Sequence, residues 1–211
     1  MGYTSRMEKL KIKEAIAFGW ETFKKRPLFI IGAFVIAIVV SGVTSSLLDP
    51  GEGAPVTFTT ILMSLASAVI TLFVEIGLIT FALRAHDAVD KVQIKDLWNP
   101  APFIWYAIAQ FLVGVIVLVG ILLLVVPGVI AMLGLMFTSY LIVDRGMGPL
   151  EAIKESWRMT KGHKGKLLLF TLALIGLNIL GFLALIVGLI VTVPISMLAM
   201  THVYRKLAAT A

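Results

Sequence analysis

Cysteine is absent from the sequence, and charged residues are scarce. Among the 211 residues, Asp, Glu, Lys and Arg make up 14%, whereas hydrophobic residues make up 59%. Without cysteine, the chain has neither a disulfide framework nor a thiolate metal site. Soluble domains contain about 25% charged residues, so this shortage of charge predicts a membrane protein.

Motifs of known enzyme classes are missing as well. The sequence contains no His-Glu-x-x-His zinc motif, no P-loop lysine signature and no Gly-x-Ser-x-Gly nucleophile turn. His86 and Asp90 would share one face of a helix, but two candidate ligands without a third are a weak metal signal. We therefore expect no enzymatic activity, no metal and no other cofactor.

Long apolar runs dominate the rest of the sequence. They cover roughly 28–48, 58–83, 102–144 and 166–204. A hydrocarbon core about 30 Å thick is crossed by about 20 helical residues, so the first two runs each predict one span. The third run is too long for one span. It divides at Pro127-Gly128, where proline removes a backbone donor and glycine permits a turn.

The fourth run has a less sharp division. Gly188 followed by Pro194 marks its bend, although Pro194 could instead kink one long tilted helix. With both runs divided, the sequence predicts an all-α membrane protein with six transmembrane helices arranged as three hairpins. A single polytopic membrane domain then covers residues 1–211, with spans at about 28–48, 58–83, 102–125, 127–144, 166–187 and 189–205.

The 18 Lys and Arg residues all fall on one side of this six-span arrangement. Seven precede the first span, three lie between the second and third, six lie between the fourth and fifth, and two follow the sixth. The longest loop on the other side, residues 49–57, carries only Asp49 and Glu52 as charged residues. Because cytoplasmic loops are rich in Lys and Arg, this predicts a multi-pass protein of the inner (cytoplasmic) cell membrane with both termini in the cytoplasm.

The basic residues also bear on the expected partners. The formal net charge is +6, but the basic residues form short segments between apolar runs. We therefore expect no nucleic-acid partner. The expected partner is the lipid bilayer, including its anionic lipids, together with a membrane protein or a second copy of the chain as a homo-oligomer.

Two polar segments that precede predicted spans match each other. Glu14-Ala15-Ile16 is followed by Trp20, and Glu151-Ala152-Ile153 is followed by Trp157 at the same spacing. A weaker echo, Lys95-Asp96-Leu97-Trp98, precedes the third span. Two explanations remain open: duplication of a hairpin with its lead-in segment, or the general enrichment of Trp and Lys at membrane interfaces.

The two matching segments predict amphipathic helices at residues 7–25 and 149–161. Their apolar residues recur at helical spacing beside basic residues, which is typical of helices that lie along a membrane surface. We expect both interfacial helices on the cytoplasmic side. The residues expected to anchor them at the interface are Trp20, Trp157, Lys24, Lys25, Arg26, Lys161 and Lys164.

Four motifs in the second half of the chain resemble a known family. They are Pro127-Gly128, Leu141-Ile142-Val143-Asp144, Glu151-Ala152-Ile153-Lys154-Glu155-Ser156-Trp157 and Thr160-Lys161-Gly162. With these motifs the sequence resembles a group of uncharacterised prokaryotic multi-span membrane proteins, together with the membrane domain of some glycerophosphodiester phosphodiesterases. The catalytic residues of the phosphodiesterase domain have no counterpart in this sequence. The resemblance therefore implies a membrane fold and location without an assigned activity.

Three polar residues lie inside predicted spans. At about 1.5 Å per helical residue, Glu75 lies roughly 13 Å from the basic side, Gln110 about 12 Å and Asn178 about 18 Å. A carboxylate at such depth is costly, so Glu75 requires partners. Small or polar residues that are typical of helix–helix contact continue its helical face: Thr60, Ser64, Ala68 and Thr71. We expect Glu75 to face neighbouring helices, with Gln110 within hydrogen-bonding reach.

Two functions explain a polar site built from Glu75, Gln110 and Asn178. A proton or cation site would make the chain a small transporter or channel. Hydrogen bonds that fix helix packing would instead suit a structural or accessory protein that binds lipid or a membrane partner. We favour the second function, because no other ionisable residue accompanies Glu75 at its depth and because Trp20 and Trp157 on basic surface helices match anionic head groups.

Overall fold

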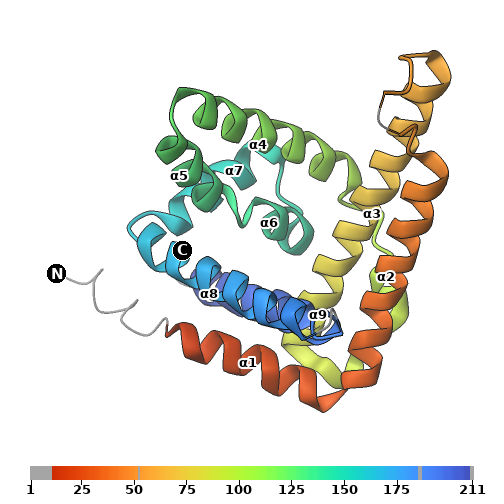
Figure 1. Cartoon of the computed structure of the whole chain (residues 1–211). Helices are drawn as coiled ribbons and strands as arrows, with labels where there is room; N and C mark the ends of the chain where they lie inside the picture. The colour runs from red at the N-terminus through yellow and green to blue at the C-terminus, as the bar shows by residue number, and fades with distance from the viewer. Residues whose placement is uncertain (1–10, 52, 185–186, 210–211) are drawn as a thin grey trace.

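The computed structural model describes residues 11–51, 53–184 and 187–209, and these ranges contain helices and no strand (Figure 1). The all-α prediction is thereby confirmed. In chain order the helices are α1 (Ile12–Lys25), α2 (Pro27–Leu48), α3 (Phe58–Ala88), the 3₁₀ helices η1 (Val89–Lys91) and η2 (Ile94–Leu97), α4 (Phe103–Leu123), α5 (Val125–Leu135), α6 (Thr138–Arg145), α7 (Pro149–Thr160), α8 (Lys164–Leu183) and α9 (Leu189–Ala208).

Five segments of the described chain are long and apolar enough to cross a membrane. They are Pro27–Leu48, Phe58–Lys91, Phe103–Leu123, Val125–Arg145 and Lys164–Leu183. Helix α9 is also 20 residues long, but its last turns carry Arg205 and Lys206. These lengths indicate a multi-pass membrane protein.

Helix starts and stops follow local chemistry. Pro27 and Pro149 occupy the first turns of α2 and α7, where a backbone donor has no helical partner. The Thr57 side chain accepts a hydrogen bond from the Thr60 backbone N–H at 3.2 Å and caps α3. Gly146 ends α6 with φ +64°, in the left-handed region that glycine adopts readily.

The division of the third apolar run lies three residues before the predicted one. Leu124 alone connects α4 to α5, with an extended backbone, and Pro127 lies inside the first turn of α5. A proline is compatible with that turn because its missing N–H would have no partner there. In the fourth run, Gly188 directly precedes α9 and Pro194 lies within that helix, while α8 ends at Leu183. Residues 185 and 186 of the predicted span 166–187 lie outside the described residues.

The segment predicted as one span at 127–144 consists of two helices. Helices α5 and α6 are separated at Met136 and Phe137. The Ser156 hydroxyl of α7 donates to the Gly134 carbonyl oxygen at 2.9 Å and accepts from the Phe137 N–H at 3.2 Å. The Thr160 hydroxyl also donates to the Gly134 carbonyl, at 3.2 Å. These bonds satisfy backbone groups that the interruption exposes, so α7 stabilises the break.

Each of the helical pairs α2–α3, α4–α5 and α8–α9 has a lead-in segment, and each lead-in segment packs on helices outside the pair that it enters. Helix α1, which leads into α2–α3, packs on α9. The short helix η2, which leads into α4–α5, packs on α3, and α7, which leads into α8–α9, packs on α5 and α6. The lead-in segments thus connect the three pairs in a closed ring. Helices α1 and α7 lie within the segments 7–25 and 149–161, although residues 7–10 lie outside the described residues.

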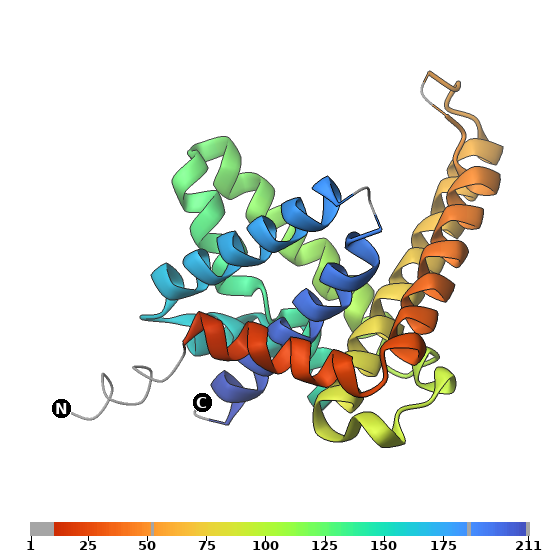
Figure 2. The ribbon, with the colours of Figure 1, turned by 60° about the horizontal axis from the view of Figure 1, so that its bottom comes forward.

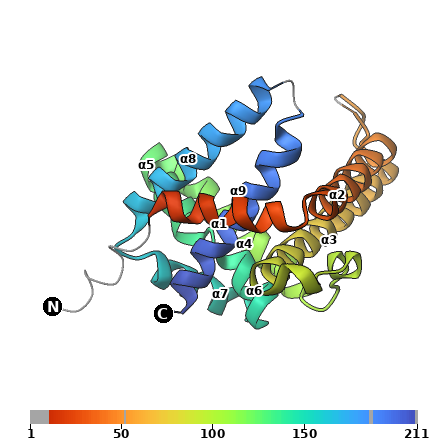
Figure 3. The same ribbon diagram turned by 90° about the horizontal axis from the view of Figure 1, so that it is seen from below.

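Helices α3, α6 and α9 each lead the chain back toward its basic segments, and we call them the returning helices. They meet at one end of the molecule, which we call the base. The larger core cluster lies here and includes Ile76, Phe137, Leu141 and Tyr204, each less than 1% exposed. From the base the pairs diverge, so that the far ends of α2–α3 and α4–α5 lie well apart (Figure 2). Seen from below, α1 crosses the base beside α9 (Figure 3). The molecule therefore has a packed base and separated apolar arms.

Candidate functional site

Glu75 lies on α3, partly buried against α4. The Tyr106 hydroxyl donates a hydrogen bond to the Glu75 Oε2 at 3.1 Å, and Gln110 Nε2 lies 3.5 Å from the same oxygen. The Ser139 hydroxyl of α6 donates to Gln110 Oε1 at 3.3 Å. The acid is therefore the centre of a polar network that joins α3, α4 and α6.

Asn178 lies apart from this network. Its Nδ2 donates to the Leu174 carbonyl and to the Ser196 hydroxyl, both at 2.9 Å, so it joins α8 to α9. The structure thus brings Glu75 and Gln110 together and gives Asn178 other partners. Similar depth places residues at one level of the membrane but does not fix which way each helix turns its side chains.

A crevice of about 500 Å³ begins beside the Glu75 network. Its lining comes from α2, α3, α4 and the loop after α2: Ser45, Leu48, Asp49, Pro50, Ser64, Ser67, Ala68, Thr71, Leu72, Ala107, Gln110 and Phe111. Of the small and polar residues on the helical face of Glu75, Ser64, Ala68 and Thr71 therefore face this crevice. Gln110 lies in both the crevice and the network, so polar groups connect the loop after α2 with Glu75.

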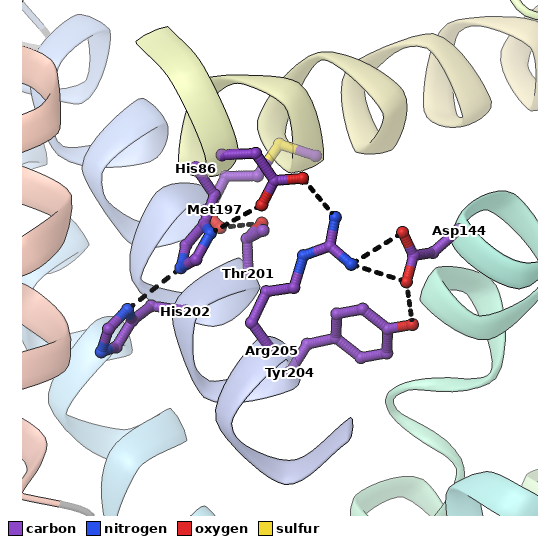
Figure 4. Close-up of polar contacts among 8 residues, drawn as sticks. His86, Asp144, Met197, Thr201, His202, Tyr204 and Arg205 are labelled. Carbon is purple, nitrogen blue, oxygen red and sulfur yellow. Dashed lines mark hydrogen bonds and ion pairs between the residues drawn. The ribbon is translucent and has the colours of Figure 1, made fainter. Parts of the chain in front are cut away.

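An ion-pair cluster joins the returning helices at the base (Figure 4). Arg205 of α9 donates to both carboxylate oxygens of Asp144 at 2.8 Å and to Asp87 at 2.6 Å. The Tyr204 hydroxyl donates to Asp144 at 2.7 Å. One arginine therefore ties α9 to α6 and to α3. The sequence analysis missed this cluster, although Asp144 ends one of the motifs that carried the family resemblance.

His86 does not pair with Asp90, the residue that would share its helical face. Its Nδ1 lies 3.1 Å from Asp87, and its Nε2 lies 3.2 Å from His202 Nδ1 (Figure 4). The Phe18 ring stacks on His202. Asp90 instead offers its backbone carbonyl to Arg26. Across residues 11–51, 53–184 and 187–209, no three His, Cys, Asp or Glu side chains gather closely enough to hold a metal.

The predicted interface anchors fall into two groups. Trp20 and Trp157 are 44% and 41% exposed, with Lys24 and Lys164 over their rings at 5.7 Å and 3.3 Å. Lys25 and Lys161 are also exposed. Arg26 is different, because its guanidinium donates to backbone carbonyls in and just after η1: Val89, Asp90 and Val92. Arg26 therefore holds α3 and η1 in place.

Helix α1 is also tied to the base electrostatically. The Lys206 ammonium lies 3.3 Å from the Glu14 carboxylate, and this hydrogen bond lowers the pKa of Glu14, with a further contribution from Lys11. Both side chains are exposed enough for solvent to weaken the pair. The contact therefore orients α1 on α9 more than it stabilises the fold.

A second cavity is almost wholly apolar. It is a groove of about 490 Å³ along α2 and α3, closed at its basic end by η2. The lining residues are Ile36, Ala37, Val40, Val69, Ile70, Phe73, Val74, Ile94, Leu97 and Trp98. Trp98 is 68% exposed and its ring stacks on Phe73 at 5.3 Å between centroids. A tryptophan at the mouth of an apolar groove is typical of a membrane interface.

Apolar helical arms, an acid inside an apolar helix and a charged base indicate a multi-pass helical membrane protein. The chain belongs to the family described as protein of unknown function (DUF975), whose model matches residues 54–211. The family is thus one of unknown function, as the sequence motifs suggested.

Curated relatives come from mycobacteria. The chain is 26% identical over 168 residues to "Uncharacterized protein Rv2560" of Mycobacterium tuberculosis (strain ATCC 25618 / H37Rv), which covers 80% of this chain and 51% of the relative. "Uncharacterized protein Mb2590" of Mycobacterium bovis matches with the same identity and coverage. The chain spans about half the length of the curated relatives it matches. No solved structure matches.

Proposed function

We propose that the chain is a prokaryotic inner-membrane protein of six spans, with α9 as the sixth. All 18 Lys and Arg residues of the sequence then fall on one side of the six-span arrangement, which the positive-inside rule assigns to the cytoplasm. Helices α1 and α7 lie along the cytoplasmic surface with Trp20 and Trp157 at the interface. A periplasm-active reporter that works at the C-terminus would contradict this orientation.

The proposed role is that of an accessory membrane protein that binds lipid and, through its arms, a membrane partner or a second copy. The groove along α2 and α3 carries the proposal, because its apolar walls and interfacial Trp98 suit an acyl chain. Diverging arms support it, since they offer apolar surface that lipid or partner helices must cover (Figure 2). We further propose that the chain is related to the membrane domain of some glycerophosphodiester phosphodiesterases. The proposed role involves no enzymatic reaction, no cofactor and no nucleic acid.

The amount of lipid that stays bound to the chain through purification tests this role. We expect the detergent-purified full chain to retain phospholipid in native mass spectrometry. Val40→Trp places a bulky ring in the groove and should lower retention several-fold. Val115→Trp on α4 is the matched control, because Val115 is similarly exposed (43% against 40%) and does not line the groove. Equal retention by wild type and both variants would refute the role of the groove.

A small transporter or channel is the second candidate function. The polar crevice favours it, because the crevice reaches Gln110 and hence the hydrogen-bonded carboxyl of Glu75. Protons or small cations are the solutes that such a site would take. A packing role for the same network predicts different behaviour, and variants of Glu75 distinguish the two.

Glu75→Gln keeps the shape and most hydrogen bonds of the network. We expect it to leave the thermal stability in detergent nearly unchanged, whereas Glu75→Leu should lose about 1 kcal/mol, as interhelical hydrogen bonds do. Thermal unfolding measures the difference, and ion flux into reconstituted vesicles tests the second function. Flux that Glu75→Gln abolishes, in a variant that unfolds like wild type, would establish transport and overturn the packing role.

A further inference from the structure

The short helix η2 separates the apolar groove from a polar pocket. Ile94 and Leu97 of η2 line the groove, whereas Lys95 and Asp96 line a pocket of about 340 Å³ at the base. Four consecutive residues thus present an apolar side to one cavity and charges to the other. This is the arrangement that a molecule with an apolar chain and a charged head requires.

We propose that η2 forms a binding site for one anionic phospholipid, with an acyl chain in the groove and the phosphate beside Lys91 and Lys95. The inference rests on the proposed lipid-binding role and adds a headgroup class and a location. Both lysines are exposed, and both line the polar pocket. Lysines beside an interfacial tryptophan attract anionic lipids.

The other charges of the pocket are already paired. Arg84 forms an ion pair with Asp96, which is 4% exposed and also accepts the Gln93 N–H at 2.9 Å. Asp87 is paired with Arg205. Among the described residues, no ion pair joins Lys91 or Lys95 to an acidic side chain. Two positive charges therefore remain for a ligand, with exposed Asp90 beside Lys91 as the neighbouring acid outside the pocket lining.

The position of η2 is fixed by contacts to α3. The Leu97 carbonyl lies against Gly77, where any side chain would overlap it. Asn99 Nδ2 donates to the Thr80 hydroxyl at 3.0 Å, and Phe73 stacks between Trp98 and Phe103. A site built on such a fixed segment needs little ordering when the ligand binds. The lysine side chains alone must settle around the phosphate.

The test compares lipid headgroups on the full chain in detergent. Phosphatidylglycerol and phosphatidylcholine with the same acyl chains are added separately, and native mass spectrometry gives their relative affinities. We expect wild type to prefer phosphatidylglycerol roughly 30-fold, because each of the two surface lysines contributes about 1 kcal/mol toward anionic lipid. Lys91→Ala with Lys95→Ala should abolish the preference. The control pair Lys13→Ala with Lys154→Ala, also exposed and outside the pocket lining, should leave it intact.

Three outcomes separate this inference from the lipid-binding role itself. If Val40→Trp lowers retention of both lipids while the Lys91/Lys95 variant lowers only that of phosphatidylglycerol, the site is supported. If Val40→Trp lowers retention but the Lys91/Lys95 variant keeps the wild-type preference, the headgroup site is refuted and the lipid role stands. If inorganic phosphate displaces phosphatidylglycerol and Val40→Trp has no effect, the pocket binds soluble phosphate and the lipid site is refuted.

Discussion

Arg205→Met should destabilise the protein by about 3 kcal/mol, the low end of the usual cost of removing one partner from a buried ion pair, because this cluster is only partly buried. The guanidinium is 28% exposed and serves two carboxylates, Asp144 at 15% and Asp87 at 54% exposure. Without it, the hydrogen bond that remains to Asp144 among the described residues is the one from the Tyr204 hydroxyl. The midpoint of thermal unfolding in detergent measures the loss.

Lys11→Met provides the matched control for Arg205→Met. Lys11 pairs with Glu14 at 3.6 Å, and both side chains are largely exposed. Such an exposed pair contributes little to stability, so Lys11→Met should unfold close to wild type. A triple variant that adds Asp87→Asn and Asp144→Asn to Arg205→Met should recover part of the loss, because no uncompensated carboxylate then remains. Equal stability of Arg205→Met and Lys11→Met would show that the cluster does not hold the base together.

Gly77→Ala should cost about 3 kcal/mol, at the upper end of the usual cost of overpacking. The new methyl group would overlap the Leu97 carbonyl oxygen and lie 2.9 Å from its carbon. Backbone atoms cannot rotate away as a side chain can, so η2 would have to leave α3. The unfolding midpoint measures the loss, and the Trp98 contact with Phe73 should weaken with it.

Gly114→Ala provides the comparison for Gly77→Ala. Among the described residues, no atom lies within 4 Å of a methyl group at this position of α4, apart from the chain neighbours of Gly114 and the nearby backbone of its own helix. Alanine favours a helix over glycine by about 0.5–1 kcal/mol, so Gly114→Ala should be neutral or slightly stabilising. If both glycine variants behave alike, the close contact between α3 and η2 does not exist in the folded protein.

Hydropathy and charge predicted most of the helices. The helices α2, α4 and α8 begin within two residues of their predicted starts, because the first residue of each apolar run can be identified from the sequence. The interruption between α5 and α6 was not predicted, since Thr138 and Ser139 do not by themselves end a helix and the break depends on Ser156 of a different helix. Its signal was Ser156 itself, a polar residue inside a motif that was otherwise explained by amphipathicity.

The polar residues were harder to place than the helices. Depth along a helix correctly brought Glu75 near Gln110, because both lie a similar distance from the basic side. The candidate site also included the deeper Asn178, but its hydrogen bonds go to Leu174 and Ser196. The Arg205 cluster depends on the ends of three helices meeting, and a linear sequence does not say which helix ends meet. Polar pairing therefore requires the packing of the helices, which the sequence pattern alone does not contain.

The ring of lead-in segments has a consequence for biosynthesis. Gly19 of α1 packs against the carbonyl of Ile195, which is 176 residues later in the chain. When the ribosome has made α1, its docking surface on α9 does not yet exist. Helix α1 must therefore stay at the membrane surface, without its contact to α9, while the intervening helices insert. The ring of lead-in segments closes only when α9 has inserted. The contact between α1 and α9 thus forms only after α9 has been made, and every earlier intermediate lacks this contact.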